Sequence, residues 1–307
     1  MIGLRQSTNL RLCRLSSQRA WLVTAQRLNS TTSTNKPKPK PKKKPKAMNI
    51  ARVPISYIGV MTDHYTPPKL RSVPLKSWPR VILNRFLVFG FNTYNVLKYK
   101  REISKPLKFN EWKDKAIEHY VRTNKAFAQA CTKAASPLEG GPYGGPQGVA
   151  NFLASKLDQV GGKHLIDALS ARASTFASQQ NMQVEWKLVS IDKNPKITTF
   201  SAIPDEDGIA TYVQFVMNLK TTQQISVKNT STGEVVQESQ TNADDYLVYS
   251  MNPWDERILL VGKIFESEPD RGLKSDMDAF DTRTMQNFIN EAGDIYRDKP
   301  ASAVEKV

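Results

Sequence analysis

Residue types used in catalysis and metal binding are few in this chain of 307 residues, and their spacing matches no catalytic motif. The three histidines, His64, His119 and His164, lie far apart, and none has metal-ligand spacing or a nucleophile partner. Of the two cysteines, Cys13 lies in a basic leader and Cys131 on an apolar helical stripe. A disulfide framework or a cysteine metal site is therefore excluded for a mature monomer. We predict that the protein is not an enzyme and holds no metal or cofactor.

Acidic and glycine-rich segments also lack the patterns of ligand-binding loops. The acids gather at predicted turns and a helix start, at positions 205–207, 244–245 and Asp276, Asp278 and Asp281, without the calcium-loop pattern. Residues 140–148 contain five glycines and two prolines, but not the glycine spacing of a dinucleotide-binding loop. We expect this segment to be a flexible, inserted loop.

The first long helix is predicted over residues 79–104, after Pro79. Its apolar arc is wide and its polar stripe narrow, which is typical of a helix in a core or at a membrane interface. We favour the core for the helix itself. The arc comprises Ile82, Leu83, Phe86, Leu87, Phe89, Phe91, Tyr94, Val96 and Leu97, and the stripe comprises Asn84, Arg85, Asn92 and Asn95.

The rest of the chain predicts helices followed by strands. From Phe109 to Cys131, apolar residues recur at helical spacing, including Trp112, Ala116 and Tyr120. Further helices are expected at about 149–158 and 163–180. From Val184 the period changes to two, around 184–188, 213–219, 247–251 and 258–264, with turn signals between these strands. This order predicts an α+β domain in which the N-terminal helices cover one face of an antiparallel sheet.

The basic charge is concentrated near the N-terminus. Of the formal net charge of +15, residues 1–46 contribute +12 and residues 69–108 contribute +9, whereas residues 109–307 carry −6. The acid-free, Arg- and Ser-rich start predicts a mitochondrial transit peptide over residues 1–35; the alternative is a basic tail of a nuclear or cytosolic protein. A disordered Pro/Lys-rich linker is expected over 36–64, a docking domain over 65–298 and a tail over 299–307. No run of about 18 apolar residues occurs, so membrane contact is expected to be peripheral.

Five separate parts of the chain carry a family resemblance, namely Phe89–Asn92, Trp112–Tyr120 with Asn124 and Phe127-Ala128, Glu185–Leu188, Gly262–Pro269 and Gly293–Arg297. They resemble the family of fungal inner-membrane mitoribosome receptors. The chain is similar, more distantly, to the membrane-docking domain of the import-motor anchor and to the metazoan exit-tunnel mitoribosomal protein. The resemblance implies a cystatin-like roll, with helices packed on a curved antiparallel sheet.

The resemblance also implies a function. The protein would be a peripheral protein on the matrix side of the mitochondrial inner membrane, aligning the mitoribosome exit with an Oxa-type insertase so that mitochondrially encoded proteins insert as they are made. Its expected partners are rRNA and exit-tunnel proteins of the large subunit, the insertase and anionic lipids such as cardiolipin. Basic residues of the 69–108 segment are the predicted membrane or rRNA contacts. They are Arg80, Arg85, Lys98, Lys100, Arg101, Lys105 and Lys108.

Two other functions remain open. An import-motor anchor subunit of the presequence translocase would use the same type of domain with a longer N-terminal extension. A pocket enzyme on the same roll would need a carboxylate and a tyrosine on the inner face of the sheet, for which Tyr212, Asp245 and Tyr246 are the candidates.

Overall fold

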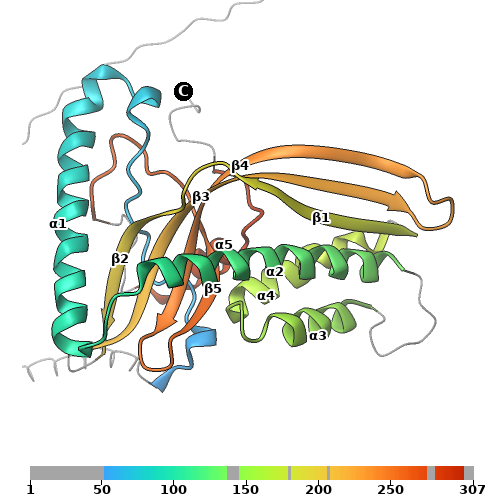
Figure 1. The fold of residues 1–307 in the computed structure, drawn as a ribbon, viewed down its shortest axis with the longest axis horizontal. Helices are drawn as coiled ribbons and strands as arrows, with labels where there is room; N and C mark the ends of the chain where they lie inside the picture. Colours follow the sequence, from blue (N-terminus) through green and yellow to red (C-terminus); the bar gives the residue numbers. More distant parts are fainter. Residues whose placement is uncertain (1–51, 137–144, 179–180, 206–207, 275–280, 301–307) are drawn as a thin grey trace, which may run out of the picture. The chain divides into compact units, whose positions relative to one another are not determined.

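The computed structural model describes residues 52–136, 145–178, 181–205, 208–274 and 281–300, all within a folded unit that spans residues 47–307 (Figure 1). The predicted transit peptide, the linker up to residue 51 and the loop residues 140–144 lie outside the described residues. Residues 145–148, which were expected in that loop, form the start of a helix.

The chain forms helices first and strands second, as the period change predicts. The helices are α1 (Trp78–Ile103), α2 (Phe109–Ala135), α3 (Gly145–Leu157), α4 (Lys163–Ser174) and, after the sheet, α5 (Thr282–Gly293). The strands are β1 (Met182–Ile191), β2 (Lys196–Pro204), β3 (Ala210–Asn229), β4 (Val235–Asn252) and β5 (Arg257–Ile264). All strand pairs are antiparallel, so the predicted α+β class is confirmed.

The long strand β3 organises the sheet. Strands β1 and β2 follow one another along one edge of β3, with Trp186 opposite Ile225 and Phe200 opposite Phe215. Strand β4 pairs along the other edge of β3, and β5 pairs with the second half of β4. In the part of the chain that the structure describes, β2 therefore has a partner strand on one side only.

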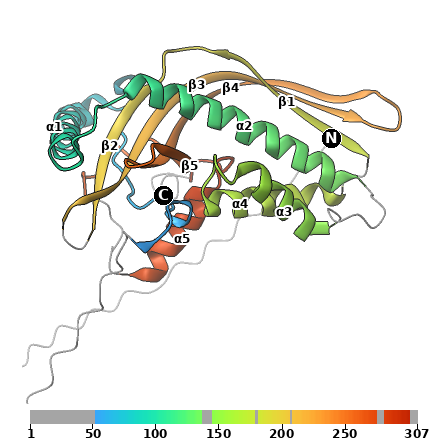
Figure 2. The same cartoon turned by 60° about the horizontal axis from the view of Figure 1, so that its bottom comes forward.

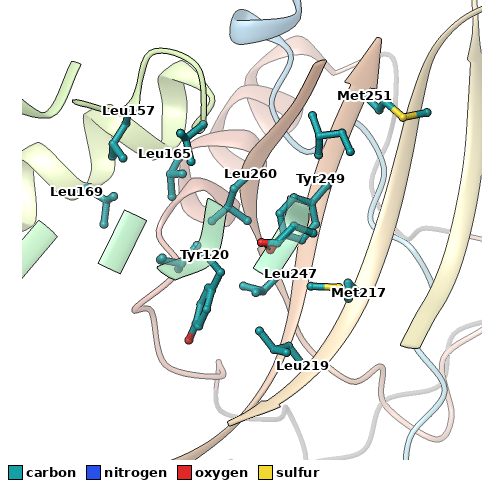
Figure 3. Packing of buried hydrophobic residues seen from close by; sticks show 14 of the residues in the cluster. Tyr120, Leu157, Leu165, Leu169, Met217, Leu219, Leu247, Tyr249, Met251 and Leu260 are labelled. Atoms are coloured by element: carbon teal, nitrogen blue, oxygen red, sulfur yellow. Dashed lines mark hydrogen bonds between the residues drawn. The ribbon is translucent and has the colours of Figure 1, made fainter. Parts of the chain in front are cut away.

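One face of the sheet packs against α2, α3 and α4. Figure 3 shows Tyr120 and the leucines of α3 and α4 gathered around side chains of β3, β4 and β5. Trp112 of α2 is 2% exposed and stacks on Phe215 with ring centroids 6.4 Å apart. The prediction that the stripe from Phe109 to Cys131 covers a core is confirmed.

The opposite face of the sheet is buried as well, which the sequence did not predict. Val216, Val248 and Val261 point to this face and pack against Ile58, before α1, and Ala292 of α5. Gly262 allows the approach of α5, because a Cβ at this position would lie 2.2 Å from the carbonyl oxygen of Ala292. Residues 52–64, which the composition placed in a linker, are thus packed against the sheet. Their few apolar residues show no period that would reveal this.

Candidate membrane and ribosome interface

Helix α1 lies along the unpaired edge of β2, at one end of the fold (Figures 1 and 2). Alternate residues of an edge strand point their backbone N–H and C=O groups away from the sheet. Asn92 donates its Nδ2 hydrogen to the carbonyl of Thr198 at 2.9 Å and accepts from the N–H of Phe200 at 3.0 Å. Asn95 accepts from the N–H of Ala202 at 3.1 Å. The amide side chains of α1 therefore satisfy backbone groups that the edge strand would otherwise leave unpaired.

The rest of the polar stripe is also used within the fold. Asn84 donates to the carbonyl of Arg271 at 3.2 Å, and Arg85 donates to the carbonyl of Pro68 at 2.7 Å. The apolar residues buried beside these side chains are Val81, Val88, Tyr99 and Ile103. The expectation that the wide apolar arc of this helix packs in the core is wrong, because the polar stripe faces the protein.

The opposite side of α1 is an exposed apolar surface, here called the outer face. Its residues are Ile82, Leu83, Phe86, Leu87, Phe89, Phe91, Tyr94 and Leu97, which are all exposed. Phe86 and Phe89 each show 70% of their surface to solvent. A contiguous apolar patch of this kind marks an interaction surface, since burial of one such side chain is worth about 1.5–3 kcal/mol. In the described part of the chain, no helix is long and apolar enough to cross a bilayer.

Three of the seven predicted contact cations are available at the two ends of the outer face. Arg80 lies in the first turn of α1 and is exposed, as is Lys100 in the last turn. Arg101 keeps 78% of its side chain exposed, although its guanidinium reaches Glu102 at 3.4 Å. An apolar helical face with cations at its ends is the arrangement of a helix that lies in the headgroup region of a membrane.

The other four cations form contacts with other groups of the same chain. Besides Arg85, Lys98 lies 3.9 Å from Glu102, and Lys105 donates to the carbonyls of Pro253 and Trp254 at 2.8 Å each. Lys108 lies 3.2 Å from Glu256 and 3.5 Å from Glu111. Its hydrogen bond to Glu256 raises the pKa of its ammonium group. Lys105 and Lys108 thus connect the segment between α1 and α2 to the turn between β4 and β5.

The three residues considered for pocket chemistry do not converge. Tyr212 donates to the carbonyl of Val53 at 2.9 Å, and Tyr246 donates to Glu266 at 3.0 Å, both on the face covered by residues 52–64. Asp245 points to the other face, where its carboxylate lies 2.8 Å from Lys263. Burial raises the pKa of the Tyr246 hydroxyl, which favours its protonated form.

Asp244 and Asp281, two of the acids considered as cation ligands, make structural contacts. Asp244 pairs with Lys69 at 2.6 Å and with Lys220 at 2.7 Å, and Asp281 caps α5 by accepting from the N–H of Arg283. Within the described ranges, no three His, Cys, Asp or Glu side chains are grouped as metal ligands would be. Asp276 and Asp278 lie outside these ranges.

Comparison with known proteins identifies the family. The family described as MBA1-like protein matches residues 43–301, a range that includes every helix and strand named above. The chain belongs to this family. It is also similar to the inner membrane mitoribosome receptor MBA1, mitochondrial, of Saccharomyces cerevisiae (strain ATCC 204508 / S288c). The two are 25% identical over 250 residues, which cover 80% of this chain and 81% of the relative. The resemblance to fungal mitoribosome receptors is confirmed.

The strings that pointed to the MBA1-like family have distinct places in the structure. Trp112 and Tyr120 are core residues of α2, and Gly262 provides the close contact with α5. Phe89 and Asn92 lie one turn apart at the border of the two faces of α1, Phe89 exposed on the outer face and Asn92 bonded to β2. Apolar residues of the outer face are the candidate contacts that the basic-residue prediction left out. The sequence feature that could have revealed them is the asparagine stripe. Its amides can bond the backbone of an edge strand, and the apolar arc then lies on the side away from the sheet.

Proposed function

We propose that this chain is a peripheral receptor on the matrix side of the mitochondrial inner membrane and that it holds the large subunit of the mitoribosome there. Membership of the MBA1-like family and the printed function of the yeast relative support this proposal. The main structural evidence for membrane contact is the outer face of α1, which exposes eight large apolar side chains. The receptor acts by binding, without catalysis.

Two contributions to the binding free energy, apolar burial and electrostatic attraction, act together in the proposed membrane contact. The outer face enters the headgroup region, and Arg80, Lys100 and Arg101 meet the phosphates of anionic lipids such as cardiolipin. Each cation near an anionic membrane surface contributes about 1 kcal/mol. Apolar burial adds to this, so the contact is strong without a spanning segment.

Ribosome contact supplies the second half of the function. The receptor holds the polypeptide exit of the large subunit against the membrane and aligns it with an Oxa-type insertase. Hydrophobic proteins encoded in the mitochondrion then enter the bilayer during their synthesis. Contacts to rRNA phosphates and to exit-tunnel proteins fix the orientation of the ribosome.

Fractionation of mitochondria tests this function. Alkaline carbonate should release the protein from membranes, because it is held peripherally. The released full-length protein should then sediment with salt-washed large subunits in a sucrose gradient. Retention in the carbonate pellet would contradict the peripheral location, and sedimentation apart from the large subunit would contradict the receptor function.

A further inference from the structure

A groove lined by lysines opens between α2, α3 and β1, far from α1. Its cavity is about 700 Å³, and four lysines line it, namely Lys125 and Lys133 of α2, Lys156 of α3 and Lys187 of β1. We call these four residues and the cavity between them the lysine groove. Among the residues that the structure describes, Glu185 is the one acid in its lining, and its carboxylate is bonded to Lys228 at 2.9 Å. The lysine groove therefore carries a surplus of positive charge.

Three of the four ammonium groups are available to a ligand. Lys125, Lys156 and Lys187 are exposed, and none forms an ion pair with any residue that the structure describes. The cavity beside α1 differs in this respect, since its Lys69 and Lys220 are both paired with Asp244. Cations without an acidic neighbour in a concave surface attract anions more strongly than the same cations in ion pairs.

The floor of the groove limits what the anion can be. Phe152 and Trp186 are only 7% and 8% exposed, and the Trp186 indole N–H is bonded to Gln223 at 2.9 Å. Neither ring is open to stacking by a nucleotide base, so the groove offers charge and not base recognition. Its lining includes none of the exposed large apolar side chains that a membrane contact would use. Several point charges around a concave surface fit a polymer of phosphates.

We propose that the lysine groove binds the phosphate backbone of ribosomal RNA, independently of base sequence. This inference rests on the proposed receptor function and assigns its RNA contact to a surface separate from α1. Asn92 of α1 bonds Phe200, which pairs with Phe215 of β3, whereas Trp186 of the groove pairs with Ile225. Ten residues of β3 thus separate the two sites, or roughly 30 Å at the rise of an extended strand. Figures 1 and 2 show α1 and the α3–β1 region at opposite ends of the sheet.

A matched pair of triple variants tests the lysine groove. The groove variant is Lys125→Gln, Lys156→Gln and Lys187→Gln. The control variant is Lys193→Gln, Lys196→Gln and Lys274→Gln, which removes the same charge from three exposed lysines elsewhere. Binding of the full-length chain to a 20-nucleotide RNA hairpin would be measured by fluorescence anisotropy over a range of salt concentrations. Flotation on cardiolipin vesicles and sedimentation with salt-washed large subunits would be measured in parallel.

The groove variant should bind the hairpin about tenfold more weakly than the control at 100 mM salt, and the slope of log Kd against log salt should fall by about 2–3. Its vesicle binding should equal that of the control. Equal RNA binding by the two variants would overturn the groove assignment, as would a loss of vesicle binding in place of RNA binding. If both variants still sediment with large subunits as wild type does, the groove assignment fails and the receptor function stands. If wild type itself does not sediment with them, the receptor function fails.

Discussion

His64 combines deep burial with an incompletely satisfied side chain. It is 5% exposed, and its Nε2 atom has no hydrogen-bond partner among the described residues. Burial lowers the pKa of the imidazole to about 4, and the charge of Arg271 adds to this effect. In the unfolded chain the pKa is near 6.5, so the unfolded state takes up a proton first as the pH falls. The contribution of neutral, buried His64 to the free energy of unfolding is therefore fully present above pH 6.5 and is lost as the pH falls toward 4.

Replacing His64 by Leu should therefore flatten the pH dependence of stability. Between pH 7 and pH 4.5, the wild-type free energy of unfolding should fall by about 2 kcal/mol more than that of His64→Leu. Urea denaturation at both pH values measures this difference. Ile58→Val, in the adjoining core, is the control and should keep the wild-type pH dependence. An identical pH dependence in wild type and His64→Leu would show that His64 is not buried as a neutral imidazole.

At the same scale, the charge pattern of the sequence could not show which cations near α1 are engaged within the fold, as Lys105 is, and which stay exposed, as Lys100 does. The partners of Lys105 are the carbonyls of Pro253 and Trp254, about 150 residues further along the chain. A charge pattern records the side chain and not a partner so distant in sequence. We therefore propose Arg80, Lys100 and Arg101 as the membrane contacts, because they stay exposed, whereas Lys105 and Lys108 are bonded to the β4–β5 turn.

At the scale of elements, α1 shows what periodicity can and cannot predict. The helix was expected at 79–104 and is found at Trp78–Ile103. The division of the helix into an apolar arc and a polar stripe was also correct, but the polar stripe faces the sheet and the apolar arc faces outward. Apolar residues usually face inward because burial is favourable. Here the neighbour of the helix is a strand edge with unpaired backbone groups, and asparagine amides match that edge better than leucine or phenylalanine.

The strands show a related limit. Alternation predicted β3 near 213–219, whereas the strand runs from Ala210 to Asn229. In the second half of β4, which pairs with the predicted part of β3, the apolar alternation is present. In its first half, which pairs with the extension of β3 beyond residue 219, residues 235–242 are exposed. Polar strands without a buried face carry no period-two apolar signal. Their pairing is recognisable only in the folded structure.

The outer face of α1 yields a prediction at this scale. Leu83→Gln, Phe86→Gln and Phe89→Gln together should leave the melting temperature near that of wild type, because these side chains are exposed. They should lower the fraction of protein that floats with cardiolipin vesicles by at least tenfold, since each apolar side chain contributes about 1.5 kcal/mol or more when buried. The control is Val189→Thr, Val235→Thr and Val236→Thr, which changes exposed apolar residues of β1 and β4. Equal flotation of the two variants would remove α1 from the membrane contact.

At the scale of the whole folded unit, a protein that joins a ribosome to a membrane needs two separate surfaces, each suited to a different partner. The outer face of α1 is apolar with cations at its ends, and the lysine groove is concave and cationic without exposed apolar side chains. A core on both faces of the sheet holds these surfaces at a fixed separation. Residues 52–64 and α5 contribute to this rigidity, because they cover the face that the N-terminal helices leave open.

The central claim is that this protein joins the large subunit to the membrane through α1, and a three-component flotation measures it most directly. Salt-washed large subunits, vesicles containing cardiolipin and the full-length chain would be mixed and centrifuged in a density gradient. Large subunits should float with the vesicles when the wild-type chain is present and should stay at the bottom without it. The α1 variant Leu83→Gln, Phe86→Gln, Phe89→Gln should bind the subunits but leave them at the bottom. Flotation of the subunits to the same extent with this variant as with wild type would contradict the account.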